Sequence, residues 1–313
     1  MLTAHGPEGG RVTNAFSVDV EEYFHATNLC GAVTAADWDR LPSTVEINTL
    51  RILEMLAMAG VTATFFVLGW VAERHPGLVR RIDRAGHEVA CHGYDHRLVT
   101  SLPAGGFRRD LAQAKAIIED IIGRPVLGYR APSWSIPAGD PAPLQILAES
   151  GFRYDSSIMP RTLDPRGHER RFPFLARSAE GHMVEFPVST LRLPGVNLPV
   201  AGGGYFRLFP YWFTRRALTR INHAERRPFV FYIHPWELDP AQPPVGKIPR
   251  LKTFRHYVNL SRTSGRLMRL LADFHFSSLR QVLQYGQRAE PLRIPAEDDS
   301  NRFPTLEEAA TRT

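Results

Sequence analysis

The chain has 313 residues, of which 43% are hydrophobic and 22% charged, a composition that excludes a disordered or fibrous protein. Its 38 basic and 32 acidic residues give a net charge of +6, which alone favours anionic partners only weakly. Cys30 and Cys91 belong to no CxxC or Cys/His pattern. This argues against a disulfide scaffold or a thiolate metal site and fits a reducing compartment.

The N-terminal residues 1–13 contain no apolar core of a secretory signal, and we expect a flexible N-terminus there. Residues 55–72 are uncharged, but Gly60 divides them into a helical half and a β-branched half. We therefore interpret them as helix, turn and buried strand rather than as a transmembrane segment. Without a signal, a cytoplasmic location is expected, and a peripheral position at the inner membrane is the alternative.

From residue 14 to about residue 158, apolar strand patterns alternate with amphipathic helices. Strands are expected at 14–20, 62–68, 87–91, 126–130 and 153–158, and helices at 43–59, 71–85, 107–121 and 143–150. This alternation predicts an α/β fold with a parallel sheet and crossover helices, open or closed into a barrel.

Beyond residue 158 the alternation weakens. Residues 161–177 hold five arginines and little periodicity, which is typical of a long loop. The further elements expected are strands at 184–188 and 229–234, an insertion at 202–206 followed by an arginine-rich helix at 211–222, and a helix, strand and helix between 267 and 285. Residues 288–313 are polar and mixed in charge, and we expect a loosely ordered tail.

Polar side chains follow five of the predicted strands, at the carboxyl ends where parallel α/β folds bind ligands. These strand ends contain Asp19, Glu21 and Glu22; the HGYDH segment 92–96; the RAPSW segment 130–134; Asp155; and the HPWE segment 234–237. A single such cluster would mean little, whereas five in one sheet predict a site.

The spacing within these clusters suggests metal and acid–base chemistry. His92 and His96 are four residues apart, so both can face one side of a helical turn and reach one metal, with a neighbouring carboxylate completing the set. Asp19 is a candidate general base and His234 a candidate proton donor. Arg130 could orient Asp19 through a bidentate pair. The alternatives are turn-capping acids, core histidines and an arginine that bridges a loop.

These segments resemble the polysaccharide deacetylase family, the NodB-like members of carbohydrate esterase family 4, over about residues 14–280. The resemblance is carried by TFFVLG, GHEVACHGYDH and the RAP segment. SVDVEEYF, GYRAPSWSI, YDSSI, GGGYFR and HPWELD are similar to the exosortase/PEP-CTERM subgroup of exopolysaccharide systems. A distorted (β/α) barrel is implied, as a single domain with insertions at 14–287 that includes a C-terminal extension from about residue 195.

The resemblance also implies site residues. Asp19 is the base, His92 and His96 bind a divalent metal, expected to be zinc, Arg130 orients the base, and His234 is the general acid. The implied reaction is metal-assisted amide hydrolysis.

Two positions depart from the family pattern. The family has a second aspartate directly after the first, but Val20 follows Asp19 here, so the third ligand must be Glu21 or Glu22. We favour Glu21, because alternate residues of a strand share a face. Asp155 is expected to orient His234.

The expected substrate-binding residues are Ser133, Trp134 and Trp236. The aromatic residue that commonly follows the RxP proline in the family is Ser133 here, with Trp134 displaced by one. A backbone N–H near Ser133 would stabilise the oxyanion, and tryptophan faces suit pyranose rings. Glu185 is interpreted as a charge on a surface strand.

The function implied is the metal-dependent removal of N-acetyl groups from amino sugars of a bacterial exopolysaccharide or its precursor. The expected partners are an N-acetylated polysaccharide or lipid-linked oligosaccharide and the exopolysaccharide synthesis machinery, and no nucleic acid. One alternative is a metal-independent C–N hydrolase of a small cyclic amide, similar to allantoinase. The other is a non-catalytic carbohydrate-binding scaffold in an export complex, against which the retained base, ligands and acid argue.

Overall fold

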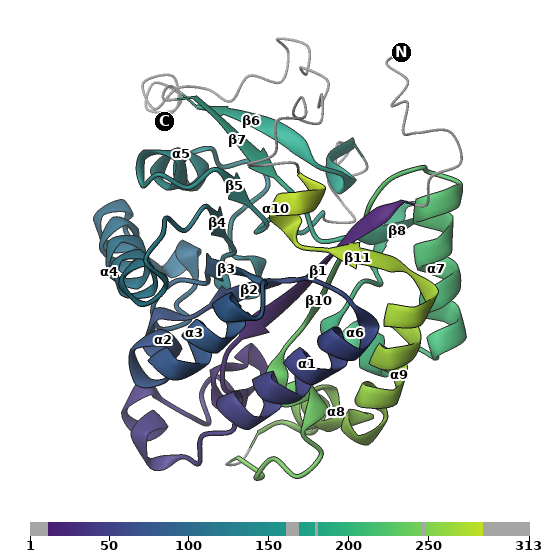
Figure 1. Ribbon diagram of the computed structural model, residues 1–313, viewed down its shortest axis with the longest axis horizontal. Coiled ribbons are helices and arrows are strands. Elements are labelled where there is room, and N and C mark those ends of the chain that lie inside the picture. Colours follow the sequence, from purple (N-terminus) through teal and green to yellow (C-terminus); the bar gives the residue numbers. More distant parts are fainter. Residues whose placement is uncertain (1–11, 161–168, 179–180, 246–247, 284–313) are drawn as a thin grey trace.

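The computed structural model describes residues 12–160, 169–178, 181–245 and 248–283 (Figure 1). The predicted tail at 288–313 and all but the last two residues of the predicted N-terminal segment 1–13 lie outside these ranges. The strands are β1 (Thr13–Val20), β2 (Thr64–Val67), β3 (Glu88–Cys91), β4 (Gly128–Tyr129), β5 (Tyr154–Asp155), β6 (Phe174–Ser178), β7 (Gly181–Glu185), β8 (Thr190–Leu193), β9 (Val196–Pro199), β10 (Val230–Ile233) and β11 (His275–Ser277). The helices are α1 (Val45–Ala59), α2 (Gly69–Arg74), α3 (Pro76–Arg84), α4 (Ala104–Ile122), α5 (Ala142–Glu149), α6 (Gly203–Leu208), α7 (Tyr211–His223), α8 (Arg250–Tyr257), α9 (Leu260–Asp273) and α10 (Leu279–Val282).

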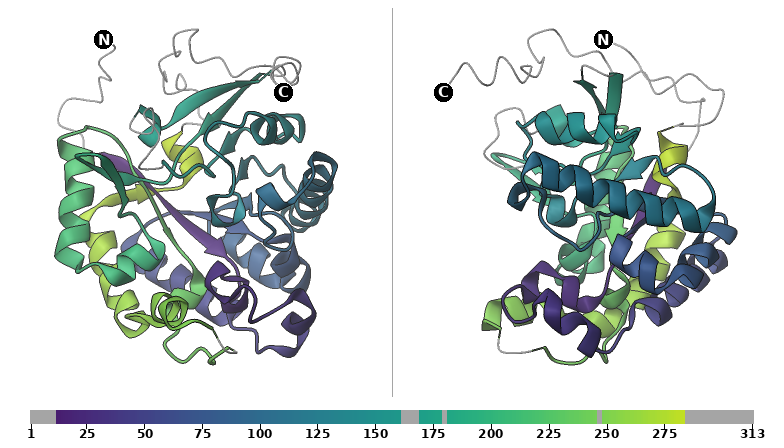
Figure 2. Two further views of the ribbon diagram at one scale, coloured as in Figure 1. Left: turned by 180° about the vertical axis from the view of Figure 1, so that it is seen from behind. Right: turned by 90° about the vertical axis from the view of Figure 1, so that its left-hand side faces the viewer.

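A nine-stranded sheet forms the centre of the described chain, in the order β10-β1-β2-β3-β4-β5-β7-β6, with β11 also pairing with β1. Its pairs are parallel except for β6 with β7. The sheet curls into a half-barrel, and helices form a layer around it (Figure 2). The predicted α/β barrel-type fold is thereby confirmed. Strands from the C-terminal part of the chain, β10 and β11, lie directly beside the first strand.

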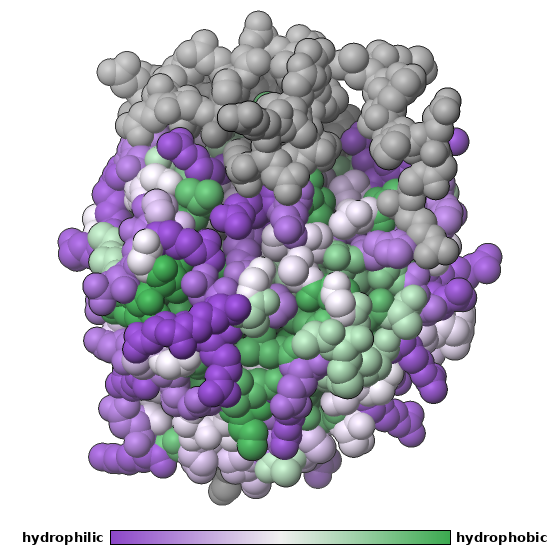
Figure 3. Space-filling model, in the orientation of Figure 1, coloured by the Kyte–Doolittle hydropathy of each residue, from purple (hydrophilic) through white to green (hydrophobic). Residues whose placement is uncertain are grey.

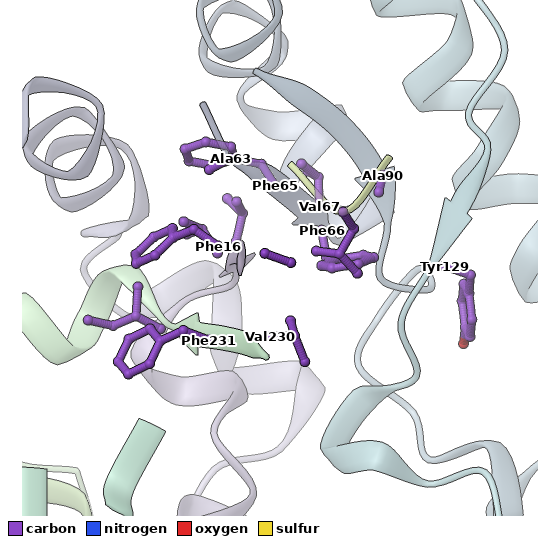
Figure 4. Packing of buried hydrophobic residues seen from close by; sticks show 14 of the residues in the cluster. Phe16, Ala63, Phe65, Phe66, Val67, Ala90, Tyr129, Val230 and Phe231 are labelled. Atoms are coloured by element: carbon purple, nitrogen blue, oxygen red, sulfur yellow. The ribbon is translucent and has the colours of Figure 1, made fainter. Parts of the chain in front are cut away.

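Aromatic side chains fill the interior between the strands (Figure 4). Phe16 of β1 stacks on Phe231 of β10 with ring centroids 5.7 Å apart, and it meets Phe276 of β11 edge-on at 5.5 Å. Phe65 and Phe66 of β2 are fully buried in the same core. Because burying one such ring stabilises a fold by roughly 1.5–3 kcal/mol, this cluster ties the C-terminal strands to the N-terminal one.

Two expectations about the helical segments have clear outcomes. Residues 55–72 form the end of α1, a turn, β2 and the start of α2, as predicted; α1 ends at Gly60, whose φ of 65° suits glycine. The single helix expected at 71–85 is instead two helices, because Pro76 begins a new one. No helix in the described ranges is both long and apolar enough to cross a bilayer.

The loop predicted at 161–177 is partly wrong. Residues 161–168 lie outside the described chain, but residues 174–178 form β6, which pairs antiparallel with β7. Phe174 and Ala176 are buried while Leu175 between them is half-buried, so the strand alternation is present among the arginines that obscured it. The hairpin of β8 and β9 was not predicted, although its Pro194-Gly195 pair is a turn signal.

Hydrophobic residues also reach the surface. Figure 3 shows them gathered around the middle of the face where α1, α9 and β11 cross the sheet, with hydrophilic residues towards the margins. Met58 of α1 is 70% exposed. The C-terminal part adds further exposed apolar side chains on other elements, namely Leu208, Trp212, Leu251 and Phe254.

Candidate active site

Residues that follow β1, β3, β4 and β10 surround one pocket of about 300 Å³. The structure brings most of the predicted site residues to it. Those that line it are Asp19, Glu21, His92, His96, Ser133, Trp134, His234 and Trp236. Arg130 is buried beside Asp19, behind the lining.

Arg130 holds one carboxylate oxygen of Asp19 and leaves the other facing the pocket. Arg130 Nη1 donates to Asp19 Oδ1 at 2.6 Å and to Ser17 Oγ at 2.8 Å. Arg130 Nη2 donates to Ser156 Oγ at 3.0 Å, and the guanidinium lies 4.2 Å above the Phe66 ring. The expected bidentate pair is therefore a single contact, because the other nitrogens bind Ser156. Asp19 Oδ2 remains available at the pocket, 3.9 Å from His234 Nε2.

Glu21, His92 and His96 place one ligand atom each within 4.8 Å of one another. The Nδ1 atom of His92 lies 2.7 Å from the carbonyl oxygen of Arg130, which can only accept, so Nδ1 carries the proton and Nε2 is free to bind a metal. Glu21 Oε2 is buried and accepts no well-aligned hydrogen bond, although His96 Nε2 is 2.8 Å away. An orphaned carboxylate oxygen beside two imidazoles fits a divalent cation.

The charge state of this cluster also suits a metal. Burial opposes the ionisation of Glu21, but His96, His234 and His92 lower the pKa of Glu21 below its usual range. Burial lowers the pKa of His92 to about 4, so this imidazole is neutral at pH 7. An ionised carboxylate and a neutral histidine are the forms that bind metals.

The HGYDH segment does not present its histidines from a helical turn as predicted. It is an irregular loop, in which Gly93 has a φ of 77° and His96 a φ of 60°. Asp110 Oδ2 accepts from the backbone N–H of Tyr94 and holds the loop. His92 and His96 thus reach the same site because Gly93 and His96 adopt left-handed backbone conformations, not because they share one side of a helical turn.

Glu22, the alternative ligand, points away from the histidines. Its carboxylate accepts from the Thr44 backbone N–H at 3.0 Å and from the Ser43 hydroxyl, directly before α1 begins. Burial raises the pKa of Glu22. It stabilises the first turn of α1, and Glu21 is the acid that meets His92 and His96.

His234 follows β10 and faces both acids of β1. Its Nε2 lies 3.7 Å from Glu21 Oε1, and its Nδ1 lies 3.0 Å from Glu237 Oε2. Burial would lower the pKa of His234, but Glu21, Glu237 and Asp19 raise it to about 9. The imidazole is therefore protonated at neutral pH.

Glu237 is a site residue that sequence reasoning missed. Burial opposes its ionisation, yet Arg207 and His234 lower the pKa of Glu237 to about 2. Arg207, which is buried, donates through Nε to Glu237 Oε1 at 2.6 Å. The signal was the i, i+3 spacing of His234 and Glu237 in the HPWE segment.

The expectation that Asp155 orients His234 is not met. Asp155 accepts from the Ser157 hydroxyl, and its neighbour on β7 is Glu185, with which it is in register. Glu185 is fully buried and accepts from the backbone N–H groups of Ser157 and Ile158, so it is not a surface charge either. Burial raises the pKa of Asp155 to about 6 and that of Glu185 well above its usual range. Asp155 Oδ2 and Glu185 Oε2 have no other hydrogen-bond partner. The two adjacent carboxyl groups therefore share a proton, because two buried negative charges side by side are unfavourable.

The predicted substrate-binding residues differ in their exposure. Trp236 is only 4% exposed, with its ring stacked near those of His234 and His256, and its Nε1 donates to Glu21 Oε1 at 3.0 Å. It supports Glu21 and has no open face for a sugar. Trp134 lines the pocket and packs edge-on against Tyr232, with ring centroids 4.4 Å apart. Ser133 also lines the pocket.

The C-terminal part of the chain forms one wall that the sequence did not predict. Tyr205 and Leu208 of α6, and Phe254 and Arg255 of α8, line the pocket beside His234. The insertion expected at 202–206 contains the start of α6, whereas α8 was not expected.

Comparisons with known proteins divide the chain in two. Residues 31–154 match the polysaccharide deacetylase family model, and residues 156–284 match a domain of unknown function, DUF3473. His92 lies in the first match and His234 in the second, while Asp19 precedes both. The pocket therefore needs all three parts.

Relatives and solved structures agree with the first match. A peptidoglycan deacetylase from Helicobacter pylori is 30% identical over 38% of this chain and 40% of its own length. A chitooligosaccharide deacetylase from Rhizobium leguminosarum bv. trifolii is 40% identical over 22% of this chain and 33% of its own. The chain thus spans less than half of either relative. A candidate polysaccharide deacetylase structure from Mycobacterium smegmatis shares the fold, with a TM-score of 0.60 at 23% identity over 89% of this chain and 91% of that one. Residues 31–154 are thus similar in sequence to the polysaccharide deacetylase family, and the chain as a whole shares the fold of the Mycobacterium smegmatis structure.

Proposed function

We propose that the protein hydrolyses N-acetyl groups from amino sugars of a bacterial exopolysaccharide or its lipid-linked precursor, and that it needs a divalent metal. One observation carries this proposal. A carboxylate with one free oxygen, a Glu–His–His cluster and a protonated imidazole face the same pocket. Amide hydrolysis needs these groups together, as base, metal ligands and acid.

Glu21, His92 and His96 would hold the metal, and their nitrogen and carboxylate donors suit zinc. When bound, the ion would polarise the amide carbonyl and water as a Lewis acid. Trp236 and the Arg130 carbonyl orient Glu21 and His92 for this task.

The protein's own side chains move the protons. Asp19, tied to Arg130 through Oδ1, takes a proton from water at Oδ2. The water oxygen adds to the acetyl carbon, and a backbone N–H near Ser133 stabilises the oxyanion. His234, held through Nδ1 by Glu237, donates its Nε2 proton to the sugar nitrogen as the C–N bond breaks. Acetate and a free amino sugar leave.

The names of the relatives support a glycan substrate, since peptidoglycan and chitooligosaccharides both carry N-acetyl groups. The DUF3473 match covers the C-terminal extension, with GGGYFR and HPWELD, two of the segments similar to the exopolysaccharide subgroup. On this basis we propose a polysaccharide or lipid-linked oligosaccharide as partner, with the exopolysaccharide synthesis machinery nearby.

The test combines metal analysis with acetate release from N-acetylglucosamine oligomers, before and after chelation. We expect about one ion per chain and chelator-sensitive activity. Asp19→Asn should abolish turnover and keep the metal, whereas His92→Ala should lose both, with thermal unfolding checking that each variant folds. Full activity in either variant would contradict the roles assigned to Asp19 and His92. Absence of both metal and acetate would favour a metal-free cyclic-amide hydrolase or a binding scaffold.

A further inference from the structure

Charge is distributed unevenly along the C-terminal part of the chain. No acidic residue occurs between Asp239 and Asp273, a stretch with seven lysines and arginines. Three of these, Arg250, Lys252 and Arg255, are exposed on α8. Among the described residues, none of the three side chains contacts a carboxylate. An unpaired cationic helix is therefore available to an anion.

This helix is also part of the pocket, because Arg255 and Phe254 belong to the lining. Arg207 fixes their position: its Nη1 donates to the carbonyl of His256 at 2.7 Å and its Nη2 to that of Arg255 at 3.1 Å. Arg207 also pairs with Glu237. With a further Nη1 bond to the Val258 carbonyl, four of its five N–H groups bind within the protein.

The acids of the pocket each face a cationic or imidazole side chain, although Asp19 Oδ2 and Glu21 Oε2 remain open to a ligand. Asp19 pairs with Arg130, and Glu21 with His96. The lining also includes the uncharged Thr27 and Asn28. Within the described chain, Arg255 is thus the arginine of the pocket lining without a carboxylate partner, since Arg207 pairs with Glu237.

The neighbouring aromatic residue indicates what kind of anion fits. Phe254 is 53% exposed at the pocket rim, where its ring can cover the C–H face of a sugar. A guanidinium one residue away can bind a carboxylate or phosphate through two parallel hydrogen bonds. Together they suit an acidic sugar.

We propose that the substrate is an anionic glycan, whose acidic groups next to the N-acetylated sugar bind Arg255 and the cations Arg250 and Lys252 along α8. This inference rests on the proposed deacetylase function and narrows it to one substrate class. An anionic lipid surface would also attract a helix with exposed Leu251 and cations. The substrate is favoured because Phe254 and Arg255 line the same pocket as the proposed catalytic residues.

The test compares two oligosaccharides of equal length bound to the Asp19→Asn protein. One is a chitin oligomer, which is neutral, and the other alternates N-acetylglucosamine with glucuronate. Calorimetry should show about tenfold tighter binding of the acidic oligomer, weakening with salt, as expected for a charge-assisted contact. Arg255→Ala should remove this preference by weakening the binding of the acidic oligomer. Lys252→Ala should reduce the preference for the acidic oligomer. Arg80→Ala is the control: it removes an exposed charge of α3 and should leave the preference unchanged.

Equal affinities for the two oligomers, no binding of either, or a preference that survives Arg255→Ala would each overturn the inference. The inference would also be overturned if the protein bound phosphatidylglycerol vesicles through Arg255 but bound the two glycans equally. That result would assign α8 to a membrane surface. Acetate release is measured in parallel with the unsubstituted protein. If the acidic oligomer binds through Arg255 but no acetate is released from either oligomer, the anionic subsite stands and the hydrolase function fails.

Discussion

The carboxylate of Glu237 joins the buried Arg207 to the partly buried His234, since one oxygen meets Arg207 and the other meets His234. It holds the imidazole by Nδ1 and adds negative charge that raises the pKa of His234. Arg207 in turn keeps Glu237 ionised. This buried chain of charges explains how the proposed acid stays protonated between two other carboxylates.

We expect Glu237→Gln to lower kcat/KM by about tenfold to a hundredfold, because the imidazole is then poorly oriented and is protonated in a smaller fraction of the molecules. Losing the anion lowers the pKa of His234, so the imidazole deprotonates sooner as pH rises. The alkaline limb of the pH profile should therefore move to lower pH. Profiles of acetate release check this, with Glu54→Gln on the exposed side of α1 as control. An alkaline limb at the unchanged pH would contradict the role of Glu237.

Single residues were predictable where their chemistry is local. Asp19, His92 and His234 directly follow apolar strands, so their position at one sheet edge follows from the topology. Asp155 was misassigned because its partner Glu185 is 30 residues away on a strand whose neighbour the sequence does not reveal. Trp236 was misassigned because stacking against His256 depends on α8, which no pattern indicated.

At the level of elements, the glycines before α6 fix the position of β10. Gly202 has a φ of 135°, and a Cβ there would lie 2.0 Å from the carbonyl oxygen of Tyr232. Tyr232 precedes His234 by two residues on the strand end. The close approach of two backbones at this point therefore sets where the proposed acid stands.

We expect Gly202→Ala to destabilise the fold by about 3 kcal/mol or more, through backbone strain and the clash with β10. Gly204→Ala is a matched control two residues away, because its added Cβ would meet nothing closer than Arg207 Nη2 at 3.8 Å. Urea unfolding should show a large loss of stability in the first variant and a change within about 0.5 kcal/mol in the second. Equal urea midpoints for the two variants would show that β10 can move away from the Cβ added at residue 202.

Elements were predictable where periodicity is strong, as for α1, α4 and the strands up to β5. The short strands β8 and β9 and the helix α8 have few residues, and their patterns are interrupted by prolines and arginines. Packing against β10 and α6 decides their form, and such contacts cannot be seen in a local sequence window.

At the scale of the whole molecule, the pocket is built from the first strand, the polysaccharide deacetylase match and the DUF3473 match. Strand β10 brings His234 to β1 because Val18 and Ile233 are in register. The DUF3473 part thus contributes strands at both ends of one sheet, with β10 and β11 beside β1 and with β7 and β6 beyond β5. It also supplies the proposed acid His234, its partner Glu237 and the cationic helix α8.

The same continuous sheet buries the Asp155–Glu185 pair between β5 and β7, where it links stability to pH. Both groups have a raised pKa in the folded protein, so the native state binds more protons than the unfolded state once pH exceeds the ordinary carboxyl range. The stabilising contribution is complete at low pH and is lost as pH rises through about 6 and beyond. One proton corresponds to about 1.4 kcal/mol per pH unit.

Glu185→Gln tests this linkage, because the amide oxygen can keep the bonds from Ser157 and Ile158 while its NH₂ group donates to Asp155. The variant should lose less free energy of unfolding than the parent between about pH 5 and pH 8. It should therefore be the more stable protein at the alkaline end. Urea unfolding between pH 5 and pH 8 measures how the free energy of unfolding changes with pH. For the control Glu54→Gln, this dependence should be parallel to that of the parent. Parallel curves for Glu185→Gln would mean that the two carboxyl groups ionise independently of folding.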